Sequence, residues 1–60
     1  MSDLVRLNKF ISDAGVCSRR EADEFIASGR VRVNGKTPEV GMRINPWRDK
    51  VKVDGILLEG

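Results

Sequence analysis

Hydrophobic residues near the start of the chain recur at spacings of three and four residues. Five of them would share one face of a helix: Leu4, Leu7, Phe10, Ile11 and Ala14. The pattern predicts a first helix over residues 4–14. Gly15 would end it, because glycine readily takes the left-handed conformation in which many helices stop.

A second helix is predicted by its start signal. Ser18 followed three residues later by Glu21 has the spacing of a capping box, in which each side chain binds a free backbone amide at the helix start. We expect a helix over residues 19–28 that ends before Gly29. Three apolar residues should face inward: Ala22, Phe25 and Ile26.

The hydrophobic period changes to two after residue 29. Valines and arginines alternate over residues 30–33, as in a half-buried strand, and Asn34-Gly35 is a favoured two-residue hairpin turn. Pro38 limits the returning strand because it cannot donate a ladder hydrogen bond. Residues 41–49 are rich in turn formers. Two further strands, 51–53 and 56–58, flank a second turn.

These elements predict an α+β fold in which two short packed helices precede a small antiparallel sheet of three or four strands. Sixty residues form at most one domain, so residues 1–60 are taken as a single unit. A chain of this size has no room for a deep active-site cavity. We therefore expect no small-molecule substrate site in it.

The residue types present exclude several kinds of chemistry. The chain has no histidine and one cysteine, so we expect no disulfide, no zinc or other metal site, no cofactor and no catalytic residue. It shows no signal peptide and no long apolar run, which favours a cytoplasmic protein without a membrane partner. Cys17 is interpreted as a packed or half-exposed structural residue.

Positive charge is concentrated in the first part of the chain. Residues 1–36 contain seven Lys or Arg against five Asp or Glu, whereas residues 37–60 contain four of each. Within the first part, Arg19 and Arg20 stand in the first turn of the second predicted helix, where positive charge is unfavourable. A bound phosphate would reverse that penalty. The alternative is that they pair with Asp23 and Glu24, one helical turn away.

A second basic surface is predicted on the strand that follows. If Val31 and Val33 face the core, then Arg30, Arg32 and Asn34 point the other way. A solvated strand face is the alternative interpretation. Two aromatic residues could stack on bases, Phe10 and Trp47, but we expect both to cover the small core. Trp47 is the better stacking candidate, because it lies in a loop beside Arg48.

Three blocks of sequence, taken together, resemble a known family. Arg6-Leu7-Asn8-Lys9-Phe10-Ile11, Cys17-Ser18-Arg19-Arg20-Glu21-Ala22-Asp23 and Gly29-Arg30-Val31-Arg32-Val33-Asn34-Gly35-Lys36 are similar to the S-four RNA-binding domain. The likeness covers nearly the whole chain. More narrowly, the chain resembles the N-terminal module of bacterial ribosomal RNA pseudouridine synthases. Residues 45–48 depart from the commoner family pattern.

The resemblance implies RNA held across the helix pair and the adjoining strand, with a separate catalytic domain following in the parent protein. It implies phosphate contacts at six residues: Arg6, Lys9, Arg19, Arg20, Arg30 and Lys36. Ser18 would cap the second helix and also touch RNA. Arg32 and Asn34 would form the neighbouring surface.

Three functional hypotheses follow. The first is a module that anchors structured ribosomal RNA for a pseudouridine synthase, which converts uridine to pseudouridine in its other domain. The second is a stand-alone ribosome-associated RNA-binding protein of the heat-shock type. The third, from a different class, is a protein-interaction module whose Arg/Asp and Arg/Glu pairs are only surface charge.

Overall fold

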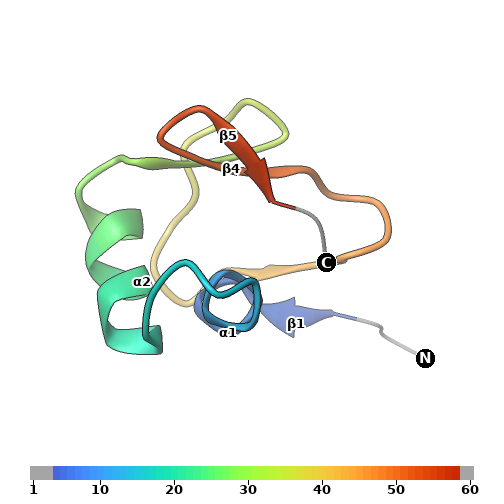
Figure 1. Ribbon diagram of the computed structural model, residues 1–60. Coiled ribbons are helices and arrows are strands. Elements are labelled where there is room, and N and C mark those ends of the chain that lie inside the picture. Colours follow the sequence, from blue (N-terminus) through green and yellow to red (C-terminus); the bar gives the residue numbers. More distant parts are fainter. Residues whose placement is uncertain (1–3, 59–60) are drawn as a thin grey trace.

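The computed structural model describes residues 4–58, which form two helices and five short strands (Figure 1). In chain order these elements are β1 Val5–Arg6, α1 Leu7–Asp13, α2 Arg19–Ala27, β2 Val31–Val33, β3 Arg43–Ile44, β4 Val51–Val53 and β5 Ile56–Leu58. The predicted α+β class is confirmed. Neither helix in this range is long and apolar enough to cross a membrane.

Helix α2 begins as its sequence predicts. The Ser18 hydroxyl accepts a hydrogen bond from the Glu21 backbone amide at 3.2 Å, and the Glu21 carboxylate accepts one from the Ser18 amide at 3.3 Å. These reciprocal bonds satisfy two donors that a helix start leaves free. After Ala27 the chain turns at Gly29, whose φ of 80° is the left-handed conformation expected at a helix end.

Helix α1 is shorter than predicted, because the chain before it is extended. Val5 pairs with Ile44 in a two-stranded antiparallel sheet, β1 with β3, and the Leu7 amide donates to the Met42 carbonyl at 3.0 Å. The assignment of Leu4 to the helix was wrong, and its side chain is 49% exposed. Pairing with a distant strand has overridden the local helical spacing.

The remaining strands form a second sheet in the order β2-β4-β5, all antiparallel. The single sheet expected from sequence is therefore two sheets, and residues 41–49, predicted as turns, contain β3. The turn at Asn34 and Gly35 forms as predicted, but the returning chain makes one isolated bridge, between Val33 and Lys36. It then leaves the sheet toward Pro38, and β4 takes the place beside β2.

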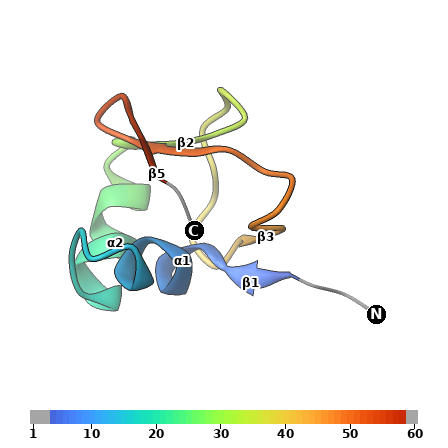
Figure 2. The same ribbon diagram turned by 45° about the vertical axis from the view of Figure 1, so that its right-hand side comes forward.

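The core lies between the two layers that Figures 1 and 2 show, with the helices along one side and the β2-β4-β5 sheet along the other. Sheet β1-β3 lies beside α1. Every element except β1 and β5 contributes at least one buried hydrophobic side chain, and the set is Leu7, Phe10, Ile11, Ala22, Ile26, Val31, Val33, Ile44, Val51 and Val53. Phe25, also predicted to face inward, is half-buried against this core.

Candidate nucleic-acid interface

Arg19 and Arg20 lie exposed in the first turn of α2. Their predicted alternative partners, Asp23 and Glu24, do not hold them. Within residues 4–58 neither arginine side chain forms an ion pair or hydrogen bond, and the ion pairs present involve other residues. Two unneutralised guanidinium groups therefore stand at a helix end whose dipole already disfavours positive charge.

Asp13 connects this charge to the end of α1. Lys9 Nζ lies 2.8 Å from the Asp13 carboxylate. This hydrogen bond, together with the positive charges of Lys9 and Arg19, lowers the pKa of Asp13. The charge of Arg19 thus acts on the same carboxylate that Lys9 contacts. Lys9 on α1 and Arg19 in the first turn of α2 therefore both act on Asp13, the last residue of α1.

Arg6 and Arg43 extend the positive surface into sheet β1-β3. The register places them directly opposite one another, and both are exposed. Side chains opposite each other in an antiparallel pair project from the same face, and like charges in that position repel. No carboxylate pairs with either guanidinium group within the described part of the chain. An anion bound between them would remove the repulsion.

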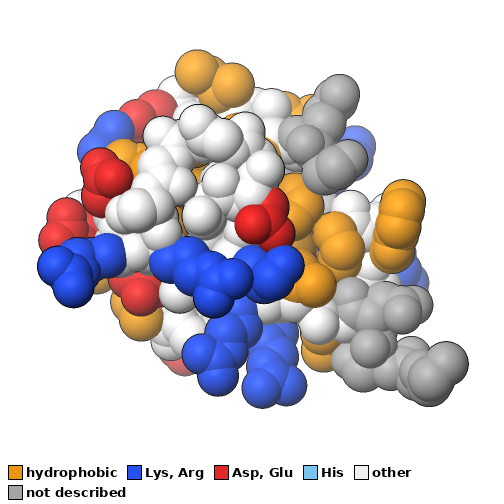
Figure 3. Space-filling view, turned by 60° about the horizontal axis from the view of Figure 1, so that its bottom comes forward, with side chains coloured by type: hydrophobic (Ala, Val, Ile, Leu, Met, Phe, Trp, Pro, Cys, Tyr) orange, Lys and Arg blue, Asp and Glu red, His pale blue; other side chains and the backbone are white. Residues whose placement is uncertain are grey.

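We call the set Arg6, Lys9, Arg19, Arg20 and Arg43 the helical basic face. Its members come from β1, α1, α2 and β3: Arg6 and Arg43 are opposite in register, Lys9 and Arg19 both act on Asp13, and Arg20 adjoins Arg19 in the first turn of α2. Figure 3, which views the molecule from the side of the helices, shows Lys and Arg side chains gathered in one cluster there. The structure thereby brings together four of the residues singled out from sequence.

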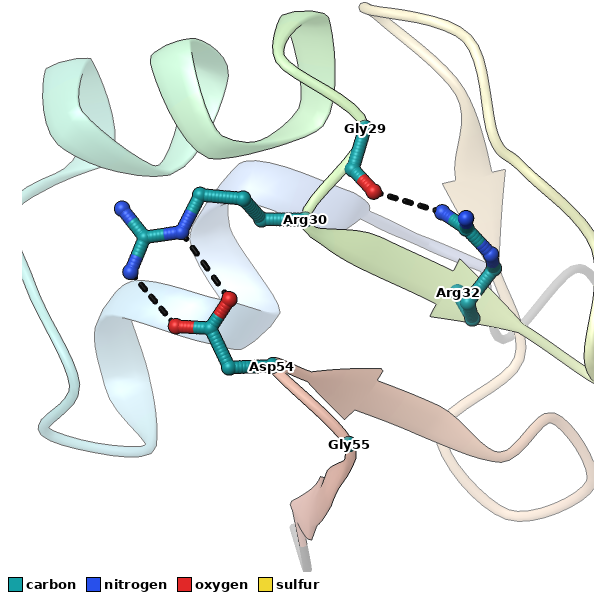
Figure 4. A pocket seen from close by; sticks show the side chains of 5 residues that line it. All are labelled: Gly29, Arg30, Arg32, Asp54 and Gly55. Atoms are coloured by element: carbon teal, nitrogen blue, oxygen red, sulfur yellow. Dashed lines mark hydrogen bonds and ion pairs between the residues drawn. The ribbon is translucent and has the colours of Figure 1, made fainter.

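Arg30 is held by other groups of the chain. Its Nε donates to Asp54 Oδ1 at 3.0 Å and its Nη2 pairs with Asp54 Oδ2, as Figure 4 shows. Its guanidinium carbon lies 4.1 Å from the centre of the Phe25 ring. The hydrogen bond to Asp54 raises the pKa of Arg30, and the same contact lowers the pKa of Asp54. Two of the three guanidinium nitrogens are thus already in use.

Arg32 turns back onto its own strand. Its Nη1 donates to the carbonyls of Gly29, at 2.6 Å, and Val31, at 3.0 Å. Arg30 and Arg32 border one open hollow, together with Asp54 and Gly55 (Figure 4). The strip expected from the alternation of β2 therefore exists as exposed side chains, but contacts within the chain fix both arginines.

Asn34 and Lys36 lie apart from the helical basic face. In Figures 1 and 2 the turn that follows β2 stands at the end of the molecule opposite α1. The Asn34 side chain is occupied, since its Nδ2 donates to Asp49 Oδ1 and its Oδ1 accepts from the Lys50 amide, both at 2.9 Å. Lys36 is exposed beside a shallow depression that Thr37 also lines. The structure does not bring these two residues to the helices.

Of the other residues considered from sequence, Cys17 and Phe10 pack within the chain, whereas Trp47 is exposed. Cys17 is half-buried against the core, and burial, followed by the charge of Glu21, raises its pKa. That environment disfavours the reactive thiolate, and the interpretation of Cys17 as a packed residue is confirmed. Phe10 is in the core as predicted. Trp47 is 85% exposed, so the expectation that it covers the core was wrong.

A family model described as the S4 domain matches residues 5–46, which include both helices and strands β1 to β3. The chain belongs to the S4 domain family. The resemblance noted from the three sequence blocks is confirmed, and this S4 domain contains all nine residues singled out as contacts within its matched range.

Curated relatives of this S4 domain carry the names of RNA pseudouridine synthases. One is a dual-specificity RNA pseudouridine synthase of Escherichia coli (strain K12), 54% identical over 55 residues that cover 92% of this chain and 19% of the relative. An RNA pseudouridine synthase of Aquifex aeolicus is 54% identical over 85% of this chain and 21% of its own length. Ribosomal large subunit pseudouridine synthase B of Bacillus subtilis is 46% identical, over 90% and 22% respectively. The chain spans about a fifth of the length of these relatives.

Sequence reasoning missed Arg43. The balance of four cations and four acids over residues 37–60 hid a local excess, since residues 43–52 contain Arg43, Arg48, Lys50 and Lys52 against Asp49 alone. A shorter charge window would have found this segment. The position of Arg43 opposite Arg6 needed the pairing of β1 with β3, which no local pattern predicts.

Proposed function

We propose that this S4 domain anchors structured ribosomal RNA for a pseudouridine synthase whose catalytic residues lie in another domain. The observation that carries the proposal is the helical basic face, where five cations from four elements meet and four of them have no acidic partner among residues 4–58. The names of the relatives supply the substrate class, which is RNA.

The arrangement suits the phosphate backbone of a folded RNA. Guanidinium groups bind phosphate oxygens through two parallel hydrogen bonds, and here they are spread over neighbouring elements. Contacts to phosphates set the position of a protein on RNA without reading the bases, and RNA shape supplies much of the selectivity. Such a module would present one uridine to a distant active site.

The nine residues proposed from sequence then have different roles. Arg6, Lys9, Arg19 and Arg20 are proposed as direct phosphate contacts, with Arg43 as an addition. Ser18 fixes the start of α2 and so the direction of both arginines, with its hydroxyl at the RNA surface. Four residues are proposed to contact RNA only where it extends beyond the helices: Arg30, Arg32, Asn34 and Lys36.

Different observations bear on the two other hypotheses, the protein-interaction module and the stand-alone RNA-binding protein. The protein-interaction module depended on Arg19 and Arg20 being neutralised by neighbouring acids, and those pairs do not form within residues 4–58. The stand-alone ribosome-associated protein shares the binding surface. The names of the relatives favour the synthase over it.

Salt-dependent binding tests the proposal. Arg19→Ala with Arg20→Ala should weaken binding to RNA hairpins of unrelated sequence by similar factors, since phosphates are common to all of them. For roughly five phosphate contacts, the slope of log affinity against log salt should be about −3.5 to −4.5. The double variant should reduce its magnitude by about 1.4 to 1.8. Filter binding from about 50 to 200 mM salt measures both quantities.

A matched control separates specific contacts from net charge. Lys50→Ala with Lys52→Ala removes the same two charges from exposed positions outside the helical basic face. This control should retain most of the affinity and slope, while circular dichroism confirms that both double variants are folded. If the arginine and lysine double variants lost equal affinity, the effect would be one of net charge alone. If the folded arginine variant kept the same salt slope, Arg19 and Arg20 would not contact the RNA.

A further inference from the structure

Trp47 is exposed in a way that folding does not explain. Its side chain is 85% exposed, the highest value among the large hydrophobic residues of the described chain. A tryptophan normally contributes a large buried area to a core or an interface. Here most of that area faces solvent, so the indole ring is accessible to a binding partner.

The turn that carries Trp47 is held by a set of hydrogen bonds. The Asn45 side-chain oxygen accepts from the Trp47 amide at 2.9 Å, and the Asn45 carbonyl accepts from the Arg48 and Asp49 amides at 3.1 and 2.8 Å. Asp49 accepts from the Asn45 amide at 2.7 Å and from the Asn34 side chain at 2.9 Å. A fixed backbone presents the indole ring, so little backbone freedom is left to lose on binding.

The charges around the turn favour a nucleic-acid partner. Residues 43–49 contain two exposed cations, Arg43 and Arg48, and one acid, Asp49. Both carboxylate oxygens of Asp49 accept hydrogen bonds, from the Asn34 side chain and the Asn45 amide, so this acid is held by the chain itself. A protein partner with an apolar surface would have to desolvate these cations. A nucleotide offers a flat base for the indole ring and a phosphate for Arg48.

The turn also continues directly from the helical basic face. It follows β3, whose Arg43 lies opposite Arg6, so only residues 44–46 separate Arg43 from Trp47. An RNA helix on that face would have its flanking nucleotides near this side of the domain. Unpaired bases are the part of RNA that aromatic side chains bind, because their faces are free to stack.

We propose that Trp47 is a stacking platform for an unpaired base that flanks the RNA helix held on the helical basic face, with Arg48 beside the phosphate of that nucleotide. The site rests on the proposed function for the RNA itself. It would add preference for RNA with a single-stranded flank. Stacking of this kind contributes about 5- to 150-fold in affinity per base.

The chain is suited to a direct test, because Trp47 is its only tryptophan and it has no tyrosine. The probes are three RNA hairpins with one common stem: a blunt form, a form with a short adenosine tail, and a form with an abasic tail of equal length. The adenosine tail should quench Trp47 fluorescence and bind more tightly than the blunt hairpin. The abasic tail carries the same phosphates and should not quench.

Variants connect the signal to the side chain. Trp47→Ala should lose the preference for the adenosine tail, by about 5- to 150-fold, and bind the blunt hairpin like the unaltered protein. Trp47→Phe should retain most of the preference, because phenylalanine also stacks. The exposed position allows both variants to fold, which circular dichroism checks.

Three other outcomes would contradict the stacking site, and they can be told apart. If the unaltered chain binds the blunt hairpin but neither tail changes its fluorescence or affinity, the stacking site is overturned while the RNA-anchoring function stands. If no hairpin binds, both proposals fail. A blue shift of Trp47 emission that grows with protein concentration in the absence of RNA would instead assign the indole ring to contact between copies of the chain.

Discussion

Two turns of the molecule, Asn34-Gly35 and Asp54-Gly55, have nearly the same backbone and different surroundings. The φ angles are 52° and 79° in the first and 52° and 82° in the second. Both have positive φ at both central residues, as a type I′ hairpin turn requires. The first leads to a single bridge at Lys36, whereas the second leads into the full strand β5.

The first side chain of each turn also binds different partners. Asn34 has a donor and an acceptor, and it uses them to bind the Asp49 carboxylate and the Lys50 amide. Asp54 has two acceptors, and it uses both on the guanidinium of Arg30. The two turns share a backbone conformation, and one atom decides what the first side chain binds: Asn34 has the donor Nδ2 where Asp54 has the acceptor Oδ2. One attaches the Trp47 turn, and the other holds Arg30, which lies between α2 and β2.

The largest effect on stability is expected from substitutions that disfavour the positive φ shared by the two turns. Gly35→Val and Gly55→Val should each lower the free energy of unfolding by about 1–3 kcal/mol, because a β-branched residue resists positive φ. A Cβ at either position meets no atom within 4 Å, so the cost lies in the backbone and not in a clash. Thermal melts measure it. Gly35→Asn and Gly55→Asn are the matched controls and should lose much less, and a valine variant with an unchanged melting temperature would contradict the strain.

A smaller effect is expected when only the side chain of the first turn is removed. Asn34→Gly keeps the positive φ and loses two hydrogen bonds, which should lower the free energy of unfolding by about 1–2 kcal/mol. The Lys50 amide, which donates to Asn34 Oδ1, should exchange its hydrogen faster. Amides of α2 serve as the internal reference, and equal acceleration in both regions would indicate general loosening.

The smallest effect is expected at the second turn. Asp54→Asn tolerates the same backbone and removes the charge opposite Arg30, an exposed pair of the kind that contributes little to stability. This variant should differ from the unaltered chain in how its free energy of unfolding depends on pH. The pKa of Asp54 is lowered from its ordinary value of 3.8 when the chain folds, so the ion pair stabilises the fold above that value and is lost as pH falls below it.

Chemical unfolding at about pH 5 and about pH 2 measures this dependence. The unaltered chain should lose more stability between the two than Asp54→Asn does. Some loss should remain in the variant, because the pKa values of Asp13 and Asp49 are lowered as well. An identical loss in the two chains would show that the Arg30–Asp54 contact does not form in solution.

Sequence predicted the elements whose signals are local. The capping box at Ser18, both turns and the β4-β5 hairpin depend on residues within a few positions of one another, and all are found. Strands of two residues have no period to detect, so β1 and β3 were missed. The helical spacing of Leu4 was equally valid locally, and only the pairing of Val5 with Ile44 decides against it.

The candidate site was predicted in part for the same reason. Arg19 and Arg20 are identified by their place in a helix start, which sequence gives directly. Arg43 depends on the register of two distant segments, and the exposure of Trp47 depends on where the turn stands relative to the core. Whether Arg30 is available also depends on Asp54, a residue that only the fold brings near it.

Sheet β1-β3 also has a consequence for the order of folding. Its two strands are separated by both helices and by β2, so closing it costs loop entropy that the helix pair and the β4-β5 hairpin avoid. Contacts between distant segments tend to slow folding. We therefore expect the helices to form early and the Arg6–Arg43 pair to be among the last surfaces assembled, so that the chain acquires its full positive face only at the end of folding.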